Sequence, residues 1–306
     1  MIRYALSRLL QIIPTLLIVA TVVFVLMRLV PGGPFDADRQ VPPEIQRQLD
    51  AKYHLDQPVL TQYGDWMWAL IAHGDLGPTF KYPNRTVNEI IRVSLPISMQ
   101  LGFLGMLFAL IVGIPLGILG ATRQNTATDY AAMGTAMIGV SIPRFVLAPL
   151  LILVISLKLY WLPVARWETW RNMILPVICA GLPVAAYIAR LTRGGMLEII
   201  RSDFIRTARA KGLSERDVIF KHAIKGAILP VVSFLGPGMS SLLVGSLVVE
   251  KIFNIPGMGR YFVEAATNRD YNLVMGVMLV YGFLLMFFNT VVDVLYSVLD
   301  PRVELK

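Results

Sequence analysis

Cysteine, histidine and charged residues are all scarce in this chain of 306 residues. The single cysteine, Cys179, lies inside an apolar run, so it can form neither an intrachain disulfide nor a multi-thiolate metal site, and we expect it to be a small packing residue. The three histidines, His54, His73 and His222, include no pair at i, i+4, which argues against a metal site. Serines in apolar runs, such as Ser141, have no histidine close in sequence. We therefore expect no metal site, no catalytic residue and no enzymatic activity on this chain.

A Gly-Lys dipeptide is also absent, which excludes the GxxxxGK[ST] loop that cradles nucleotide phosphates. If ATP drives the function of this protein, a partner subunit must bind it. Charged residues make up 16% of the chain, against about 25% in soluble proteins, and 56% of the residues are hydrophobic. The net charge of +8 does not indicate a nucleic-acid partner, because the basic residues are dispersed between long apolar runs. Basic cytosolic loops of a protein embedded in membrane lipid explain the balance more simply.

Six apolar runs are long enough to cross a hydrocarbon core of ~30 Å. Arg3 and Arg8 precede the first run, which places the N-terminus in the cytosol, and six crossings return the C-terminus to the same side. A cleaved signal peptide is the alternative for the first run, but that run is long and lacks an A-x-A-like site. The sequence thus predicts an all-α integral membrane protein with one transmembrane domain over 1–306. Its expected spans are residues 9–28, 94–122, 131–157, 172–190, 226–250 and 271–295, with an outer (periplasmic) loop at 31–92 and a cytosolic loop at 190–226.

The outer loop at 31–92 is slightly acidic, which suits the non-cytosolic side of a membrane. Apolar residues at helical spacing predict one helix after Pro42-Pro43 and a second over 60–70. Thr86 and Glu89 have the spacing of a capping box that leads toward the next span. An aromatic group is expected at the lipid headgroups or, alternatively, on a surface that docks a partner: Tyr63, Trp66 and Trp68.

The loop at 190–226, called the basic loop below, is the longest basic stretch between apolar runs. It holds nine Lys or Arg residues between Arg190 and Lys225, against four acids. One interpretation is a solvated loop that only sets the membrane topology, and the other is a rigid surface knob that a partner grips.

The pattern within the basic loop predicts two helices that meet at a knee. Ser202 or Asp203 can cap the first helix, and Gly212 can end it because glycine adopts a left-handed conformation without strain. An S-x-x-D box that begins at Ser214 then starts a second helix, which lasts to the neighbourhood of Pro230.

Arg144 is a cation near the middle of the third expected span, directly after Pro143. Burying a cation at such a depth costs at least ~2.5–3.5 kcal/mol, so the side chain needs a partner or water. Two interpretations stay open. The guanidinium faces a water-filled path and meets an anionic part of a solute, such as a peptide carboxylate, or it pairs with an acid or with carbonyl groups of a neighbouring helix.

Polar residues also lie at the ends of the last two expected spans. Glu250 and Lys251 follow the fifth span at its outer mouth, where we expect them to be solvated. Asn289 and Asp293 are one turn apart near the inner end of the sixth span. We expect them to form interhelical hydrogen bonds and, as a second choice, to line the path.

Several collinear stretches resemble the dipeptide, oligopeptide and nickel permease family of ABC importers. In the basic loop, RTARAKGL (206–213) resembles the peptide-permease form of the EAA loop, although Arg206 and Thr207 stand where the generic motif has Glu and Ala. Together with that loop the resemblance extends over nearly the whole chain, and HGDLGPTFKY with the long outer loop is most similar to the first of the two oligopeptide permease subunits. The other stretches are MRLVPGGPF (27–35), KYHLDQPVLTQY (52–63), HGDLGPTFKYPNRTV (73–87), VVEKIFNIPGMGRYFVEAATNRDY (248–271) and LDPR (299–302).

The resemblance implies the type I importer fold, in the bacterial inner (plasma) membrane. It also implies a second, similar permease, two ATPase subunits that hold ATP and Mg, and a periplasmic solute-binding protein that delivers a peptide. In such importers the ATPases pull on the basic loops, and the permeases switch between inward-open and outward-open states. Dipeptides, nickel chelates and other peptide-like molecules are alternative solutes. A secondary transporter or a non-transporting membrane scaffold is the remote alternative, and the scarcity of acids in the deep spans disfavours the former.

By the same resemblance, the helix at 203–212 docks on an ATPase and the helix at 213–222 supports it. The stretch 254–271 is implied to be a periplasmic contact and gating element. The candidates for ATPase coupling are Asp203, Phe204, Arg206, Thr207, Ala208, Arg209, Ala210, Lys211, Gly212, Leu213, Ser214 and His222. The candidates for the gate are Glu250, Pro256, Gly257, Arg260, Arg269, Asp270 and Tyr271, and those for the translocation path are Arg144, Asn289 and Asp293.

Overall fold

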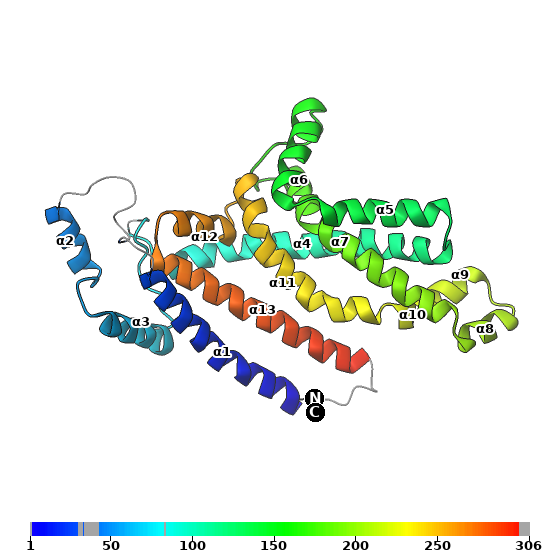
Figure 1. Cartoon of the computed structure of the whole chain (residues 1–306), viewed down its shortest axis with the longest axis horizontal. Helices are drawn as coiled ribbons and strands as arrows, with labels where there is room; N and C mark the ends of the chain where they lie inside the picture. Colours follow the sequence, from blue (N-terminus) through cyan, green and yellow to red (C-terminus); the bar gives the residue numbers. More distant parts are fainter. Residues whose placement is uncertain (1, 30–32, 34–42, 83, 300–306) are drawn as a thin grey trace.

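Long helices form the body of the molecule (Figure 1). The computed structural model describes residues 2–29, 33, 43–82 and 84–299, and within them β-pairing is limited to one isolated bridge, Pro78–Thr86. Five helices of this part are long and apolar enough to cross a membrane, which confirms the predicted all-α membrane architecture. They are α1 (Ile2–Leu29), α4 (Val87–Thr122), α7 (Trp170–Ile200), α11 (Leu229–Ile252) and α13 (Tyr271–Leu299).

The third expected span is not one straight helix. α5 (Ala127–Ser141) meets α6 (Arg144–Leu151), which continues into the π-helical segment η1 (Ile152–Lys158), at a bend of 106°. Pro143 lies at this bend, where it has no N–H for a helical hydrogen bond and its ring disfavours helical backbone at the preceding residue. Ile142 is accordingly extended, with φ of −87° and ψ of 117°. As a result, α6 projects sideways from the bundle (Figure 1).

The core lies where α4, α7 and α11 pack together. The contact between α4 and α7 is the most extensive one between described helices. Gly113 of α4 comes so close to α7 that an added Cβ would stand 2.5 Å from the carbonyl oxygen of Ala185. Small residues permit this approach, which gives packing energy to helices that gain no hydrophobic energy within lipid. Cys179 of α7 is completely buried in the same core, as expected for a packing residue.

Three short helices gather at one end of the bundle: α2 (Pro43–Lys52), α3 (Val59–His73) and α12 (Met258–Thr267) (Figure 1). The prediction of two helices in the outer loop is thus confirmed. So is the capping box, since the Glu89 N–H donates to Thr86 Oγ1 at 3.2 Å and the Thr86 N–H donates to the Glu89 carboxylate at 3.1 Å. The box fixes the residue at which α4 begins.

The aromatic residues of α3 do not form one exposed group. Trp66 is 8% exposed, and its Nε1–H donates to the Leu76 carbonyl at 3.3 Å. Tyr63 packs edge-on against Phe24 of α1, with ring centroids 5.2 Å apart, whereas Trp68 is exposed. The prediction of a shared surface position is therefore wrong for Trp66, because α3 folds onto α1 and turns one of its sides inward.

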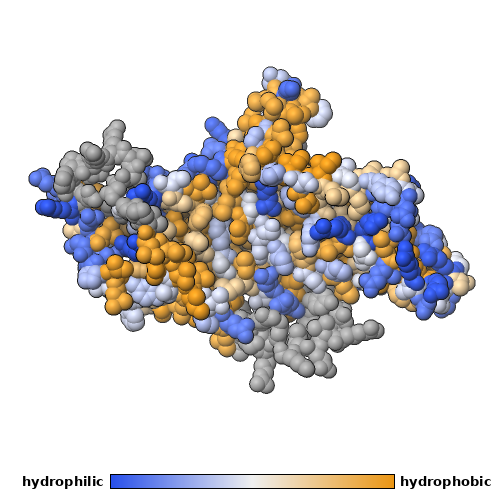
Figure 2. Space-filling view, in the orientation of Figure 1, coloured by the Kyte–Doolittle hydropathy of each residue, from blue (hydrophilic) through white to orange (hydrophobic). Residues whose placement is uncertain are grey.

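The basic loop lies at the opposite end of the bundle (Figure 1). It contains α8 (Asp203–Ala210), α9 (Glu215–Asp217), the π-helical η2 (Val218–Ala223) and α10 (Ile224–Ala227). Figure 2 shows hydrophilic residues gathered at the two ends of the long axis and hydrophobic surface over much of the middle. This is the distribution expected of a chain whose middle lies in hydrocarbon.

Candidate functional site

The basic loop folds as the predicted pair of helices joined at a knee. α8 ends at Ala210, and Gly212 has a φ of 80°, the left-handed conformation that glycine adopts without strain. The Gly212 N–H donates to the Arg209 carbonyl at 2.9 Å. Ser214 caps the next helix, since its Oγ accepts the Asp217 N–H at 3.2 Å. Helical structure then continues through η2 and α10 to the start of α11, which carries Pro230 in its first turn.

The start of α8 differs from the prediction in one respect. Ser202 occupies the capping position, but its hydroxyl donates to the Ile199 carbonyl at 2.6 Å and accepts no N–H of α8. The turn that leaves α7 takes this hydroxyl, and the Ile199 carbonyl accepts it together with the Ser202 N–H at 3.0 Å.

One face of α8 is fixed and the other is open. Ile205 and Ala208 are buried against Met196 of α7 and Val218 of η2. Of the predicted coupling residues only Ala208 belongs to this buried face. The others lie together on the surface of the knob: Asp203, Phe204, Arg206, Thr207, Arg209, Ala210, Lys211, Gly212, Leu213, Ser214 and His222.

Exposed ion pairs lie on the surface of the knob, the α8–η2 part of the basic loop, but they do not hold it in place. The Arg209 Nε lies 2.7 Å from the Glu215 carboxylate across the knee, and the Lys221 Nζ lies 2.6 Å from Asp217. Hydrogen bonds from Lys221 and Ser214 lower the pKa of the Asp217 carboxyl. Because such exposed pairs contribute little to stability, the buried face around Ile205 must hold α8 in position.

Arg144 lies at the start of α6, with its side chain against α11. Its Nη1 donates to the Ser241 carbonyl at 3.3 Å, and the guanidinium occupies the space beside Gly245. Among the described residues it has no carboxylate partner, and its Nε has no hydrogen bond. The structure therefore supplies the carbonyl partner of the second interpretation, while the path-facing role stays a prediction.

Asn289 and Asp293 line one side of a polar pocket of about 240 Å³ between α1 and α13. Gln11 and Thr15 of α1 line the other side. Asn289 also packs against Gly236 of α11, and its Oδ1 has no hydrogen-bond partner among the described residues. The two residues thus share one cavity, which lies at a helix interface.

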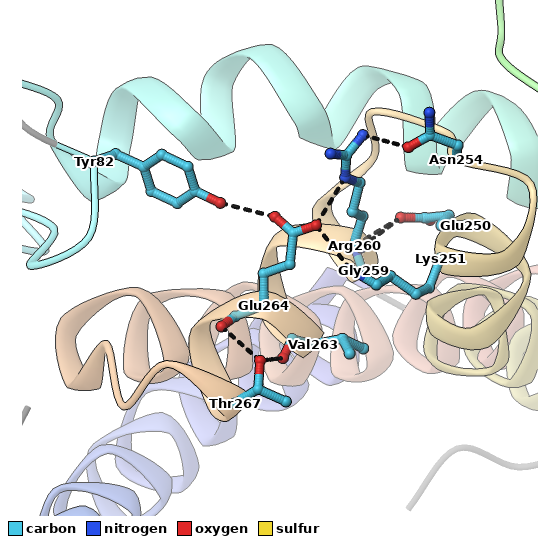
Figure 3. Close-up of polar contacts among 9 residues, drawn as sticks. All are labelled: Tyr82, Glu250, Lys251, Asn254, Gly259, Arg260, Val263, Glu264 and Thr267. Carbon is cyan, nitrogen blue, oxygen red and sulfur yellow. Dashed lines mark hydrogen bonds and ion pairs between the residues drawn. The ribbon is translucent and has the colours of Figure 1, made fainter. Parts of the chain in front are cut away.

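Glu250 is fully buried, so the prediction that it is solvated is wrong. Its Oε2 accepts the N–H of Gly259 at 2.7 Å and the N–H of Arg260 at 3.3 Å (Figure 3). Its Oε1 accepts the Ser246 hydroxyl at 2.8 Å. The chain turns back after α11 and lays α12 over the carboxylate. The next residue, Lys251, remains largely exposed.

The middle of α12 is held by a second cluster (Figure 3). The Glu264 carboxylate accepts hydrogen bonds from Lys251 at 2.8 Å, Tyr82 at 2.8 Å and Arg260 at 3.0 Å. Burial alone would raise the pKa of Glu264, but these hydrogen bonds lower it to about 2. Burial and the bond to Glu264 raise the pKa of Tyr82. The Arg260 guanidinium also donates to Asn254 Oδ1 at 2.7 Å.

The remaining gate candidates divide by exposure. Asp270 is fully buried and accepts the backbone N–H groups of Phe80 and Lys81 at 3.0 and 3.2 Å, and Tyr271 is 4% exposed. Of the seven candidates, Glu250, Gly257, Asp270 and Tyr271 are buried, whereas Pro256, Arg260 and Arg269 are at least partly exposed.

An ion pair between a buried carboxylate and an arginine at the start of the basic loop was missed at the sequence level. Asp129 of α5 is 2% exposed and accepts two hydrogen bonds from Arg193 of α7, at 2.8 and 2.7 Å. It also accepts the Asn125 N–H at 3.0 Å, so one carboxylate ties the turn between α4 and α5 to α7. The two residues are far apart in the chain and belong to no local motif, so no sequence signal identifies the pair.

Comparisons with known proteins identify the family of this chain. The family described as binding-protein-dependent transport system inner membrane component matches residues 113–305, and the corresponding N-terminal family matches residues 1–101. The oligopeptide transport system permease protein OppB of Salmonella typhimurium is 48% identical over 306 residues, which cover 99% of this chain and 100% of that protein. The dipeptide transport system permease protein DppB of Bacillus subtilis is 43% identical over 305 residues, which cover 100% of this chain and 99% of that protein.

Solved structures show the same fold at lower identity. The inward-facing MetNI methionine ABC transporter matches with a TM-score of 0.55 and 19% identity, over 70% of this chain and 97% of the matched chain. An amino acid ABC transporter solved with histidines matches with a TM-score of 0.54 and 17% identity, over 69% and 94%. The predicted fold of an ABC-importer permease is thereby confirmed. The chain therefore belongs to the family of binding-protein-dependent transport system inner membrane components, as a multi-pass permease subunit of the inner membrane.

Proposed function

We propose that this chain is the permease subunit of an ATP-driven importer that passes oligopeptides from a periplasmic binding protein into the cytosol. The observation that carries the proposal is the rigid, exposed α8 knob on a chain that is 48% identical over its length to an oligopeptide permease. Its proposed partners are a second, similar permease, two ATPase subunits that hold ATP and Mg, and the binding protein. ATP hydrolysis then resides on the partners, with both termini and the basic loop of this chain in the cytosol.

The α8 knob is suited to receive force from an ATPase. Because Ile205 and Ala208 are buried against α7 and η2, a push on the exposed Phe204 displaces those helices instead of bending a loop. From η2 the chain continues through α10 directly into α11. Movement of the knob therefore reaches two of the long helices.

At the outer end, the exposure of the gate residues assigns them different tasks. Pro256, Arg260 and Arg269 are open to a docking protein, so we place the binding-protein contact there. The buried carboxylates of Glu250 and Asp270 each accept backbone N–H groups, and we infer that they hold the gate in shape.

Arg144 is the proposed path residue that meets the carboxylate of a passing peptide. The residue is partly exposed, and one carbonyl is its only hydrogen-bond partner among the described residues. Uptake by an Arg144→Ala variant tests this role, with reduced uptake or an altered solute preference expected. Unchanged uptake and preference would remove it from the path. Asn289 and Asp293 are secondary path candidates, because their pocket is polar but lies between helices.

Dipeptides are the second candidate solute, because a dipeptide permease is 43% identical over the whole chain. Competition separates the two candidates. Uptake of a labelled oligopeptide by membranes that contain the complex should be inhibited more strongly by an excess of unlabelled oligopeptides than by an equal excess of dipeptides. The reverse order would make this chain a dipeptide permease.

Site-directed crosslinking tests the ATPase contact. A cysteine at Thr207, exposed on α8, is expected to crosslink to a cysteine on the proposed ATPase, with a yield that changes between nucleotide states. Thr267→Cys is the matched control, since it places the same thiol on α12 at the other end of the bundle. No adduct at Thr207 in any nucleotide state would contradict the coupling role.

A further inference from the structure

The first turn of α12 is capped by side chains that belong to other helices. Its capping position is Gly257, which has no side chain to accept a hydrogen bond. The N–H of Met258 donates instead to the Ser98 hydroxyl of α4 at 2.8 Å. The next two N–H groups, of Gly259 and Arg260, donate to the Glu250 carboxylate of α11. These donors would otherwise lack partners at a helix start, and a negative charge there also interacts favourably with the helix dipole.

Two glycines make room for this arrangement. A Cβ at Gly257 would overlap Oε2 of Glu250, and a Cβ at Gly259 would stand 2.9 Å from the same atom. Gly257 thus leaves room for a carboxylate that approaches the backbone from another helix, whereas Gly259 also lies close to α11 itself, since its added Cβ would stand 2.7 Å from the Leu247 Cα. Nothing in this Pro-Gly-Met-Gly stretch resembles a flexible hinge, because both glycines are buried.

We propose that Glu250 is a positioning residue that makes α12 a rigid continuation of α11. α11 starts directly after the basic loop and ends two residues beyond Glu250, so one helix connects the loop to the carboxylate. With its first turn bonded to α11 and α4, and its middle held by Glu264, α12 cannot swing independently of them. Displacement of α11 is therefore delivered to the outer helix. This inference rests on the proposed function for its role in transport, but the anchoring itself does not.

Hydrogen exchange of the full-length chain in lipid nanodiscs, with its co-purifying subunits, tests the anchoring. In Glu250→Gln the charge is lost and one side-chain oxygen remains, so exchange of the Gly259 and Arg260 N–H groups should become roughly 10- to 100-fold faster. Exchange in α7 should not change. Glu168→Gln is the matched control, because Glu168 is exposed and its one ion-pair partner among the described residues is the exposed Arg166. Unchanged protection of both N–H groups in Glu250→Gln would overturn the anchor.

Transport measurements test whether the anchor delivers movement. In Glu250→Gln, peptide uptake should fall roughly 3- to 30-fold while basal ATP hydrolysis stays within about twofold of wild type, since the coupling and not the ATPase is affected. Loss of protection together with uptake within about twofold of wild type would overturn the positioning role. If the wild-type complex takes up no peptide, the proposed function fails, and the exchange result still decides the anchor.

A second variant reaches the same site without changing Glu250. Gly257→Ala should displace the carboxylate and reproduce the loss of protection and of uptake. In the double variant with Glu250→Gln the two effects should not add, because both remove the same hydrogen bonds. Additive effects would show that Gly257 matters for another reason and would count against the anchor.

Discussion

Arg144 packs against a glycine of the neighbouring helix α11. The guanidinium occupies the space beside Gly245 of α11 and donates to the Ser241 carbonyl. A Cβ added at Gly245 would overlap the Nη1 atom. The Arg144 guanidinium therefore fits against α11 because position 245 has no side chain. A change at either residue should alter the effect of a change at the other.

Gly245→Ala is expected to destabilise the protein, although a Gly-to-Ala change inside a helix ordinarily adds about 0.5–1 kcal/mol of stability. The reason is that Arg144 must leave its site. Thermal unfolding in detergent measures the effect. Gly134→Ala is the control, because nothing lies within 4 Å of its added Cβ, and it should leave the unfolding temperature unchanged or raise it. In an Arg144→Ala background, Gly245→Ala should no longer destabilise, and persistent destabilisation there would contradict the pairing.

Glu264 gives the outer end a specific sensitivity to acid. Its pKa in the folded protein is about 2, below the ordinary value of 4.5, so its stabilising contribution is complete above about pH 4.5 and is lost as pH falls toward 2. Between those limits the wild-type unfolding temperature should drop more steeply than that of Glu264→Gln. Tyr82→Phe removes one of the three hydrogen bonds and should shift the drop to higher pH. Parallel curves for wild type and Glu264→Gln would contradict this assignment.

At the scale of elements, a short sequence motif predicts where a helix begins or ends if the residues that fix this position are neighbours in the chain. The Thr86–Glu89 box starts α4, and Gly212 ends α8, because each needs only residues within one turn. No bend was predicted within the span 131–157, because a proline in a sequence does not fix how far a helix turns, and the angle of 106° at Pro143 depends on what surrounds α6. The prediction that Glu250 is solvated was wrong because its hydrogen-bond partners belong to α12, a helix that folds back over it.

The joint between α7 and α10 offers a test with adjacent residues. A Cβ at Gly195 would collide with the carbonyl of Ala227 in α10, whereas one at Gly194 would meet nothing within 4 Å. Gly195→Ala should therefore separate α10 from α7 and reduce peptide uptake. Gly194→Ala should be neutral or slightly stabilising. Uptake relative to the amount of folded protein is the measurement. Equal uptake by the two variants would show that this joint carries no force.

At the scale of the whole molecule, the face shown in Figure 2 has hydrophilic ends and a largely hydrophobic middle, as expected of a chain that spans a membrane. Residues at the two ends are known from the structure, but their assignment to the cytosol and the periplasm rests on the charge rule applied to the basic loop. Because of this charge rule, the sequence predicted that the coupling candidates and the gate candidates lie at opposite ends of the molecule. The contacts that fix each end were not, because the Asp129–Arg193 pair and the bonds of Glu250 join distant parts of the chain.

Labelling with a membrane-impermeant maleimide checks the orientation. In intact spheroplasts, Thr267→Cys should be labelled, and Thr207→Cys should be labelled only after permeabilisation. The wild-type chain is a ready control, because its single thiol, Cys179, is fully buried and should stay unlabelled until the protein unfolds. Labelling of Thr207→Cys from outside would invert the proposed topology.

The pair of Asp129 and Arg193 bears on how the protein is made. α5 has 15 residues and is therefore about 22 Å long, which is less than the ~30 Å of hydrocarbon it would have to cross alone. Among the described residues, the Asp129 carboxylate pairs with a cation of α7, which the ribosome delivers later. A nascent chain that stops before Arg193 thus leaves the buried Asp129 carboxylate without the cation that it has in the folded protein.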